Sequence, residues 1–376
     1  MSADFSTRWA QAAVSSAAIA HNVSVIAAAV APARVWAVVK ANGYGHGAVE
    51  VARAALAGGA TGLCVALMDE GVQLRRAGIG APILVLSEQP PEVSEFVVGY
   101  GLTPTVSSTR SAAALAMAAT SAPAPVQVHM KVDTGMHRTG VSPREAVALA
   151  QSLSSMGAIE LGGVWTHFAV ADDPDHPANA RQLGVFRGVL DDLAAAGIRP
   201  PLVHAANSAA ALSRPEARFD MVRVGIAMYG LSPGAGVDRL CDDLVPALMF
   251  RARVSALRWI EAGEAVSYGL RRPVDGPTLV ATVPVGYADG VPRRLAETDV
   301  HVLVNGVPRP FAGTVTMDQI MLDCGTDSSV SVGDEVMLIG RQGDGSVGAD
   351  DWARALGTIG YEIVCGISSR VHRAHQ

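Results

Sequence analysis

A lysine followed by alternating glycines is the first feature of this sequence that could do chemistry. Lys40 directly follows the apolar run 35–39, and Gly43, Gly45 and Gly47 come shortly after it. Burying a lysine at the end of an apolar strand is costly unless its amine is neutralised or used, and the glycines let the backbone approach a ligand closely. A desolvated lysine is suited to forming a Schiff base with a carbonyl compound. The alternative is a lysine that reaches solvent where the strand ends.

Further polar side chains lie at or just after the ends of other apolar runs in the first 230 residues, or within the last run. In chain order they are Lys131, Arg138, His167, Asp172, Asn207, Ser208 and Arg223. Each has an ordinary alternative: Asn207 or Ser208 could cap a helix, Arg138 could be solvated, and His167 could be a hydrogen-bonded core residue. If the runs are barrel strands, however, these side chains gather at one mouth, which the alternatives do not predict. Ser208 and the free backbone N–H groups of Gly225 and Ile226 would suit a phosphate.

Tyrosines and one short polar motif distinguish the second half of the chain. The chain has only 6 tyrosines, and Tyr268, Tyr287 and Tyr361 lie in short, turn-like contexts. Met317 and Asp318 begin a Met-Asp-Gln motif. These residues are candidates for a functional site, with amphipathic tyrosines at a domain edge as the alternative.

The elements that must position the first group of residues alternate regularly along the chain. Eight short, Val-rich apolar runs are separated by helix-like segments, as expected for parallel strands that are buried on both faces. Eight such units favour a closed (β/α)8 TIM barrel over a doubly wound sheet, although periodicity alone leaves both open. The predicted strands are 35–39, 62–66, 82–86, 102–106, 125–132, 158–168, 202–206 and 222–226, and the predicted helices include 47–56, 68–77, 109–119, 142–155 and 179–196.

The pattern changes after residue 240, where helical periodicity nearly vanishes and turn signals accumulate. The runs 300–304 and 307–311 flank Asn305-Gly306, a dipeptide that favours positive φ and predicts a two-residue hairpin. One short helix is expected near 350–356. This part of the chain is therefore predicted to be mainly β.

Together these patterns predict an α/β protein of three parts. Residues 1–14 form an N-terminal strand that packs with the C-terminal domain, residues 15–240 form the barrel, and residues 241–376 form the mainly β domain. Between Arg8 and Arg34 there is no charged residue. We interpret this run as an amphipathic helix, not a membrane span or signal peptide, because it contains many polar residues and its apolar residues recur at helical spacing. That apolar stripe consists of Ile19, Val23, Ile26 and Val30.

Composition narrows the class of protein further. The chain has 376 residues, 49% of them hydrophobic, which excludes disorder. Its formal charge of −6 argues against a nucleic-acid partner, which would need a basic stripe. The four cysteines, at positions 64, 241, 324 and 365, are far apart and form neither a metal-binding pattern nor a disulfide scaffold. Buried, reduced thiols in a cytoplasmic protein without a metal are expected.

Five motifs together resemble the alanine racemases, a family of bacterial enzymes that use pyridoxal 5′-phosphate (PLP). The motifs are residues 37–47, 131–140, 223–230, 267–269 and 317–319, and they occur in the family's order across nearly the whole chain. The lysine motif alone is also similar to that of other barrel enzymes using PLP, such as the basic amino-acid decarboxylases. The Tyr268 and Met317 motifs are specific to the racemases. The resemblance implies interconversion of L- and D-alanine, which supplies D-alanine for peptidoglycan.

The resemblance also implies a role for each site residue. Lys40 would hold PLP and act on the D-isomer, while Tyr268, from the partner subunit of a homodimer, would act on the L-isomer. Two bases on opposite faces of Cα invert it without moving the substrate. Arg138, His167 and Arg223 would support catalysis, and Arg138 and Met317 would contact the substrate. The implied cofactor-binding residues are Lys40, Tyr44, His167, Asn207, Ser208, Arg223, Gly225, Ile226 and Tyr361.

Some positions depart from the family or leave its chemistry open. An access corridor is implied at Asp172, Tyr287, Arg293, Thr314 and Asp318. Arginine is common where Thr314 stands, so we expect a less positive corridor with altered entry kinetics or inhibitor access. His137 stands where glycine is common, and Lys131 matches a lysine that is carbamylated in some members.

Two other functions stay open at this point. One is a PLP racemase of wider range, for example for serine, and the other is a non-catalytic PLP-binding protein. The presence of both Lys40 and Tyr268 argues against the second alternative. Neither nucleic acid nor a membrane is an expected partner.

Overall fold

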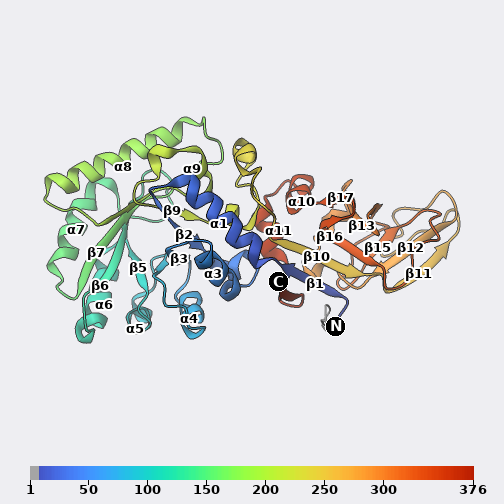
Figure 1. The fold of residues 1–376 in the computed structure, drawn as a ribbon, viewed down its shortest axis with the longest axis horizontal. Helices are drawn as coiled ribbons and strands as arrows, with labels where there is room; N and C mark the ends of the chain where they lie inside the picture. The colour runs from blue at the N-terminus through green and yellow to red at the C-terminus, as the bar shows by residue number, and fades with distance from the viewer. Residues whose placement is uncertain (1–7) are drawn as a thin grey trace. The chain divides into compact units, whose positions relative to one another are not determined.

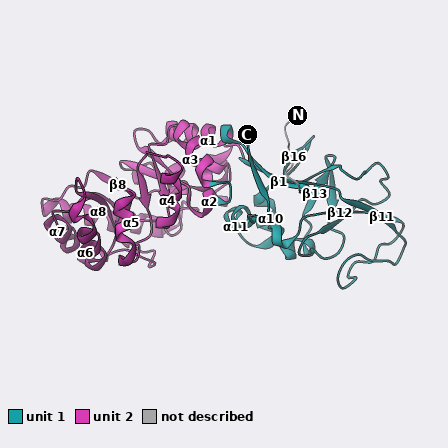
Figure 2. Cartoon of the chain, turned by 90° about the horizontal axis from the view of Figure 1, so that it is seen from below, with its two compact units in different colours: residues 1–17, 44–47, 246–376 teal, residues 18–43, 48–245 magenta. Residues whose placement is uncertain are grey.

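A computed structural model of the chain describes residues 8–376. The part of the predicted N-terminal strand that falls on residues 1–7 lies outside the described residues. The described chain divides into two compact units (Figure 2). Unit 1 comprises residues 8–17, 44–47 and 246–376, and unit 2 comprises residues 18–43 and 48–245. The sequence gives no sign that residues 44–47 group with the C-terminal part of the chain. We keep the division at residues 14 and 240 as a proposal for the domain boundaries.

Unit 2 is built around eight parallel strands in the order β8-β7-β6-β5-β4-β3-β2-β9 (Figure 1). Backbone hydrogen bonds from Asp220 N–H to Val203 O (3.1 Å) and from Arg223 N–H to Ala206 O (3.0 Å) join the two ends of this order. The sheet therefore closes, which confirms the predicted barrel and excludes the doubly wound alternative. The strands are β2 (Arg34–Val38), β3 (Gly62–Val65), β4 (Ile83–Val85), β5 (Thr103–Val106), β6 (Val126–Lys131), β7 (Ile159–Trp165), β8 (Leu202–His204) and β9 (Met221–Val224).

The helices of unit 2 surround these strands in Figure 1. In α1 the predicted apolar stripe of Ile19, Val23, Ile26 and Val30 is at most 1% exposed. Most of the uncharged run between Arg8 and Arg34 is thus a packed helix, which follows strand β1 (Ala10–Val14). No helix among residues 8–376 is long and apolar enough to cross a membrane. The helices are α1 (Ser16–Val30), α2 (Lys40–Tyr44), α3 (Ala48–Ala57), α4 (Met68–Arg76), α5 (Ser94–Gly99), α6 (Thr109–Ala118), α7 (Ala146–Ser155), α8 (Pro177–Ala195) and α9 (Ser208–Ser213).

Unit 1 is mainly β, as predicted. One sheet has the order β14-β13-β16-β10-β1-β18, with β17 also paired to β16, and a second has the order β11-β12-β15. Strand β1 pairs with β10 antiparallel and with β18 parallel. The strands are β1 (Ala10–Val14), β10 (Leu248–Arg253), β11 (Ala256–Ile260), β12 (Thr278–Val283), β13 (His301–Val304), β14 (Val307–Pro310), β15 (Ile320–Asp323), β16 (Glu335–Gln342), β17 (Gly345–Val347) and β18 (His372–His375).

In this unit the sequence predicted the hairpin correctly but only one of the two α-helices. Asn305 and Gly306 have φ of 51° and 80°, as the predicted two-residue turn between β13 and β14 requires. The expected short helix is α10 (Ala349–Leu356). A second helix, α11 (Gly360–Gly366), was not predicted, because it is short, contains glycine at both ends and has no side-chain N-cap.

The cysteines only partly follow the expectation of buried thiols. Cys64 and Cys324 are buried, whereas Cys241 is half-buried and Cys365 is exposed. Cys64 lies in a strand that is covered on both faces, while Cys365 lies in the short helix α11, one side of which faces solvent. Burial can be inferred from a strand's apolar run but not from an isolated cysteine.

Candidate active site

Lys40 is half-buried just beyond the C-terminal end of β2, where the sequence predicted it. The residues that follow do not form an ordinary helix. Ala41, Asn42 and Gly43 have φ of 52°, 53° and 62°, and Tyr44 has φ of 51°. Left-handed backbone costs a non-glycine residue about 1–2 kcal/mol, so such a turn persists only where surrounding contacts fix it. Lys40 therefore begins a strained left-handed turn.

The carboxylate of Glu70, in α4, braces this turn. Its Oε1 accepts the N–H of Ala41 at 2.6 Å, and its Oε2 accepts the N–H groups of Ala66 (2.8 Å) and Leu67 (3.1 Å). Sequence reasoning missed Glu70, because an acidic residue in the first turn of a helix is ordinary. Only the fold reveals that one of its oxygens reaches the residue after Lys40.

Arg223 is the centre of a buried hydrogen-bonded network and is itself only 3% exposed. Its NH1 lies 2.8 Å from Nδ1 of His204, and its NH2 lies 3.2 Å from Nδ1 of His167. Nε2 of His204 lies 2.9 Å from Nδ1 of His129. The guanidinium also lies over the ring of Trp165, 4.6 Å from its centroid. These contacts fix the position and plane of the guanidinium.

Burial sets the protonation of this network. Burial, and then the positive charge of Arg223, lower the pKa of His129 to about 3 and hold the pKa values of His167 and His204 well below their usual range. Burial also lowers the pKa of Arg223, to about 10, which is still far above neutrality. The network therefore combines a charged guanidinium with neutral imidazoles.

Two members of the network, His129 and His204, were missed in the sequence. Both lie within the apolar runs of buried strands, β6 and β8. A histidine inside such a run must find a polar partner, which is the one signal that could have found them. For His167 the structure fits both earlier interpretations, because it is hydrogen-bonded and also belongs to the network around Arg223.

Lys131, at the end of β6, has an unusual environment for an amine. Its Nζ donates to Oγ1 of Thr139 at 2.6 Å and lies 4.9 Å from the centroid of the Trp165 ring. Burial, and then the positive charges of Arg138 and Arg223, lower its pKa from 10.5 to about 8. A substantial fraction of this amine is therefore neutral, and nucleophilic, in slightly alkaline solution.

His137 has a backbone conformation that explains why glycine is common at this position. Its φ of 56° lies in the left-handed region, where glycine is favoured. Asp133 stabilises this loop, because its Oδ1 accepts the N–H groups of Gly135 (3.0 Å), Met136 (3.1 Å) and His137 (3.0 Å). Burial raises the pKa of Asp133, but these bonds outweigh that effect and lower it overall. Arg138, the next residue, is exposed.

The residues predicted to bind a phosphate are already linked to one another. The backbone N–H of Gly225 is not free, because it donates to Oγ of Ser208 at 2.8 Å. Ser208 is the first residue of α9, and its hydroxyl reaches the turn that leads from β9 into the 3-10 helix η5 (Ile226–Tyr229). Asn207 is the N-cap of α9, with its Oδ1 accepting the N–H of Ala210 at 3.0 Å, as its ordinary alternative predicted.

In unit 1, Tyr44 and Tyr361 pack against each other, with ring centroids 5.9 Å apart. The backbone of Gly45 lies directly against α11. Its φ is 80°, and a Cβ at this position would lie 2.3 Å from the carbonyl oxygen of Val364, so only glycine fits here. Nε of Arg373 donates to the carbonyl of Gly45 at 2.9 Å. The segment just after Lys40 is thus anchored to the helix that carries Tyr361.

A cavity of about 570 Å³ in unit 1 collects most of the candidate residues from the second half of the chain: Tyr268, Tyr287, Arg293, Met317 and Asp318. Tyr268 and Met317 are 75% and 52% exposed. Asp318 forms an ion pair with Arg370 at 2.7 Å, a partner that the sequence did not indicate.

Two predicted corridor residues do not line this cavity. Asp172 belongs to unit 2, where it lies against Gly234. Thr314 instead contacts the backbone of Tyr268, to which its Oγ1 donates a hydrogen bond at 3.0 Å.

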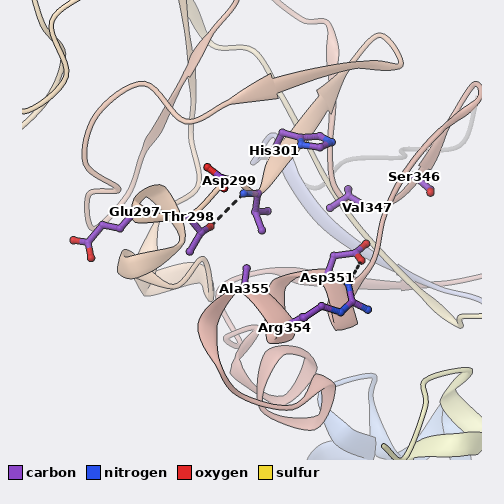
Figure 3. Close-up of a pocket in the computed structure, with 10 residues that line it drawn as sticks. Glu297, Thr298, Asp299, His301, Ser346, Val347, Asp351, Arg354 and Ala355 are labelled. Atoms are coloured by element: carbon purple, nitrogen blue, oxygen red, sulfur yellow. Dashed lines mark hydrogen bonds and ion pairs between the residues drawn. The ribbon is translucent and has the colours of Figure 1, made fainter. Parts of the chain in front are cut away.

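A second cleft in unit 1, of about 680 Å³, contains none of the predicted site residues (Figure 3). It is lined mainly by polar and charged side chains, among them His301, Asp351 and Arg354. Arg354 is held by Asp351 at 3.0 Å. Within residues 8–376, no group of three or more His, Cys, Asp or Glu side chains could hold a metal ion.

Fold and site together define a class of protein. A (β/α)8 barrel places a lysine after its first strand, and the charges of Lys40, Lys131, Arg138 and Arg223 all lower the pKa of His167. Four cations acting on one point at the strand ends suit an anionic ligand, and the lysine suits a carbonyl group. Such a barrel enzyme is suited to a compound that is both an anion and a carbonyl, and the same chain carries a mainly β unit with exposed tyrosines.

Comparison with known proteins specifies the family. Residues 14–233 match the alanine racemase N-terminal domain, and residues 247–375 match the alanine racemase C-terminal domain. The chain is 48% identical to an alanine racemase from Symbiobacterium thermophilum, over 90% of each chain. It superposes on the alanine racemase from D-cycloserine-producing Streptomyces lavendulae with a TM-score of 0.93 at 36% identity, covering 99% of this chain and 98% of that one. The chain therefore belongs to the alanine racemase family, whose members depend on PLP.

The same fold also occurs in an enzyme named for another amino acid. A histidine racemase from Leuconostoc mesenteroides superposes with a TM-score of 0.90 at 30% identity, covering 98% of each chain. The architecture alone therefore does not define which amino acid a member acts on.

Proposed function

We propose that this chain is a PLP-dependent alanine racemase that interconverts L- and D-alanine and supplies D-alanine for peptidoglycan in the cytoplasm. The observation that carries the proposal is a half-buried Lys40 at the end of β2, which pairs with the strand that holds the buried Arg223, in a chain of this family. Tyr268, in the β unit, provides the second acid–base group that inversion of Cα needs.

The residues that the resemblance assigns to the cofactor fit PLP chemically. Lys40 would bind it covalently through Nζ, and Ser208, Ile226, Tyr44 and Tyr361 would bind its phosphate, with Asn207 and Gly225 contributing through the backbone turns that they shape. Arg223 would donate a hydrogen bond to the ring nitrogen and keep its own proton, because its pKa of about 10 stays well above neutrality. When bound, PLP would withdraw electrons from the substrate and so acidify its Cα–H.

The protein's own groups then handle the proton. From D-alanine, the amine of Lys40 takes the Cα proton from one face, and the phenol of Tyr268 delivers a proton to the opposite face; from L-alanine the roles reverse. Arg138 orients the substrate carboxylate, and Met317 limits the space for the side chain. The neutral His167 supports Arg223 without adding a second positive charge.

The proposal is tested by racemisation and by cofactor content. Purified protein is incubated with L-alanine, L-serine and L-histidine, and the enantiomers are separated and quantified. We expect alanine to be converted fastest. Faster conversion of serine or histidine would contradict alanine as the main substrate. If none of the three is converted, the result would favour a non-catalytic PLP-binding protein.

Lys40→Ala tests the covalent attachment. We expect this variant to lose the yellow, borohydride-reducible adduct with PLP and all racemisation, because the replacement has no amine. Arg53→Ala, which removes an exposed cation from α3, is the matched control and should keep both. An adduct that survives in Lys40→Ala would contradict the assignment of Lys40.

A further inference from the structure

The loop that carries Tyr268 is joined to the segment before Met317 by two reciprocal hydrogen bonds. Oγ of Ser267 donates to the carbonyl oxygen of Thr314 at 2.8 Å, and Oγ1 of Thr314 donates to the carbonyl oxygen of Tyr268 at 3.0 Å. Each hydroxyl thus binds the backbone of the opposite segment. We call this pair of contacts the Ser267–Thr314 clasp.

Within one chain, the tip of this loop is exposed and its backbone is partly left-handed. Ser267, Gly269 and Leu270 have φ of 69°, 83° and 43°, and the left-handed conformation is unfavourable for the two non-glycine residues. Tyr268 and Leu270 are 75% and 64% exposed, so burial contributes little at the tip. The clasp holds Ser267, one of the left-handed residues, and the carbonyl of Tyr268, which directly follows it.

The base of the loop, in contrast, is anchored by packing. Val266 packs against a small buried cluster formed by Ile260, Val280, Ala312 and Met321. Gly313 lies directly against it, since a Cβ on Gly313 would be 2.2 Å from the carbonyl oxygen of Val266. This close approach places Thr314 next to the loop, so the clasp has a fixed support.

We infer that Ser267 and Thr314 are positioning residues that hold the backbone of Tyr268 for proton transfer. The inference rests on the proposed function, because it assigns a purpose to the position of the Tyr268 phenol. It also changes the expectation for Thr314. A corridor residue would alter substrate access, whereas a clasp residue alters how often a proton is delivered by Tyr268.

The first experiment measures the clasp without any assay of activity. Amide hydrogen–deuterium exchange is followed in a peptide covering residues 266–272 of the full-length protein. Thr314→Val replaces the hydroxyl with a methyl group of similar size and should speed exchange about fivefold, as expected for the loss of one hydrogen bond. Thr314→Ser keeps the hydroxyl and should exchange like the wild type. Unchanged exchange in Thr314→Val would overturn the inference.

A matched control removes a hydroxyl elsewhere in the same unit. Oγ1 of Thr298 donates to the carbonyl of Leu295 at 2.7 Å and accepts the N–H of Val300 at 3.3 Å, and neither partner belongs to residues 266–272. Thr298→Val should therefore leave exchange in 266–272 unchanged. Equal acceleration by Thr298→Val and Thr314→Val would mean general loosening of the unit and would overturn a specific clasp.

The second experiment reads proton delivery directly. PLP-loaded enzyme acts on D-alanine in D2O, and two products are quantified. Deuterated D-alanine (retention) forms when Lys40 returns a deuteron to the same face. L-alanine (inversion) forms when Tyr268 delivers a deuteron to the opposite face. Thr314→Val should raise the ratio of retention to inversion about fivefold, Tyr268→Phe should raise it further, and Thr314→Ser should not change it.

The outcomes separate the two proposals. A parallel fall of retention and inversion in Thr314→Val, with the ratio unchanged, would indicate an access role and overturn the positioning role. An increased ratio together with faster amide exchange supports the clasp. Failure of the wild-type protein to racemise alanine would instead contradict the proposed function, and it is recognised without any Thr314 variant.

Discussion

At the scale of single residues, the environment around Trp165 controls which groups carry charge. Arg223 and Lys131 both lie over its ring, 4.6 Å and 4.9 Å from the centroid. Arg223 keeps its charge at neutral pH, whereas the pKa of Lys131 falls to about 8. The same burial thus leaves one cation intact and makes the other a titrating amine.

The lowered pKa of Lys131 predicts a pH-dependent carbamate. Carbon dioxide adds to the neutral amine, so the reaction needs deprotonated Lys131. With a pKa of about 8, roughly half of the amine is neutral at pH 8 but only about 1% at pH 6. We expect a carbamate carbon signal in NMR spectra of protein supplied with 13C-bicarbonate at pH 8, and its loss as the pH falls toward 6.

Lys131→Met is the variant that tests the assignment, because it keeps the apolar stem over Trp165 without an amine. The signal should be absent from this variant at every pH. A signal of equal size in Lys131→Met would assign the carbamate to another amine, and its absence from the wild type at pH 8 would contradict the prediction.

At the scale of elements, the strained turn after β2 depends on a neighbouring helix. Glu70 Oε1 binds the N–H of Ala41, while Oε2 binds the N–H groups of Ala66 and Leu67 at the start of α4. A glutamine could accept on one side only and would point its NH2 group at a backbone donor on the other. Glu70→Gln should therefore destabilise the protein by about 1–3 kcal/mol, as measured by urea denaturation, and lower kcat.

Glu50→Gln is the control for this prediction. Glu50 and Arg53, both in α3, form an exposed ion pair at 2.7 Å. Such surface pairs contribute little to the free energy of unfolding. Its loss should change stability by less than about 0.5 kcal/mol. Equal effects of the two substitutions, or a stable Glu70→Gln variant with unchanged kcat, would show that the turn does not need this brace.

The element scale also separates what sequence could predict from what it could not. Apolar runs bounded by turn residues gave all eight barrel strands, and Asn305-Gly306 gave the hairpin. The left-handed turn was hidden although Asn42-Gly43 favours positive φ, because Ala41 and Tyr44 have no local preference for it and its brace comes from another helix. Sequence motifs located Lys40 and Arg223, whereas His129 and His204 carry no spacing signal. The contact of His204 with Arg223 and that of His129 with His204 arise only when distant strands close the barrel.

At the scale of the whole molecule, the candidate residues are divided between two units. Lys40 and Arg223 belong to unit 2, whereas Tyr268 and Met317 belong to unit 1. Residues 44–47 are an exception, because they follow Lys40 closely and yet group with unit 1 through Gly45 and Tyr44. The family resemblance implies that a homodimer completes each site with the Tyr268 of the partner subunit, and the high exposure of Tyr268 agrees with such a complement.

A complementation experiment tests this shared site. Lys40→Ala and Tyr268→Phe subunits, each inactive alone, are mixed in equal amounts under conditions that allow exchange. Random pairing makes about half of the dimers mixed, and each mixed dimer has one site with both wild-type residues and one with neither. We therefore expect recovery of about a quarter of the wild-type activity. Mixing Lys40→Ala with the double variant Lys40→Ala/Tyr268→Phe should recover none, and two affinity tags verify exchange. Mixed dimers without recovered activity would mean that each site is built within one chain.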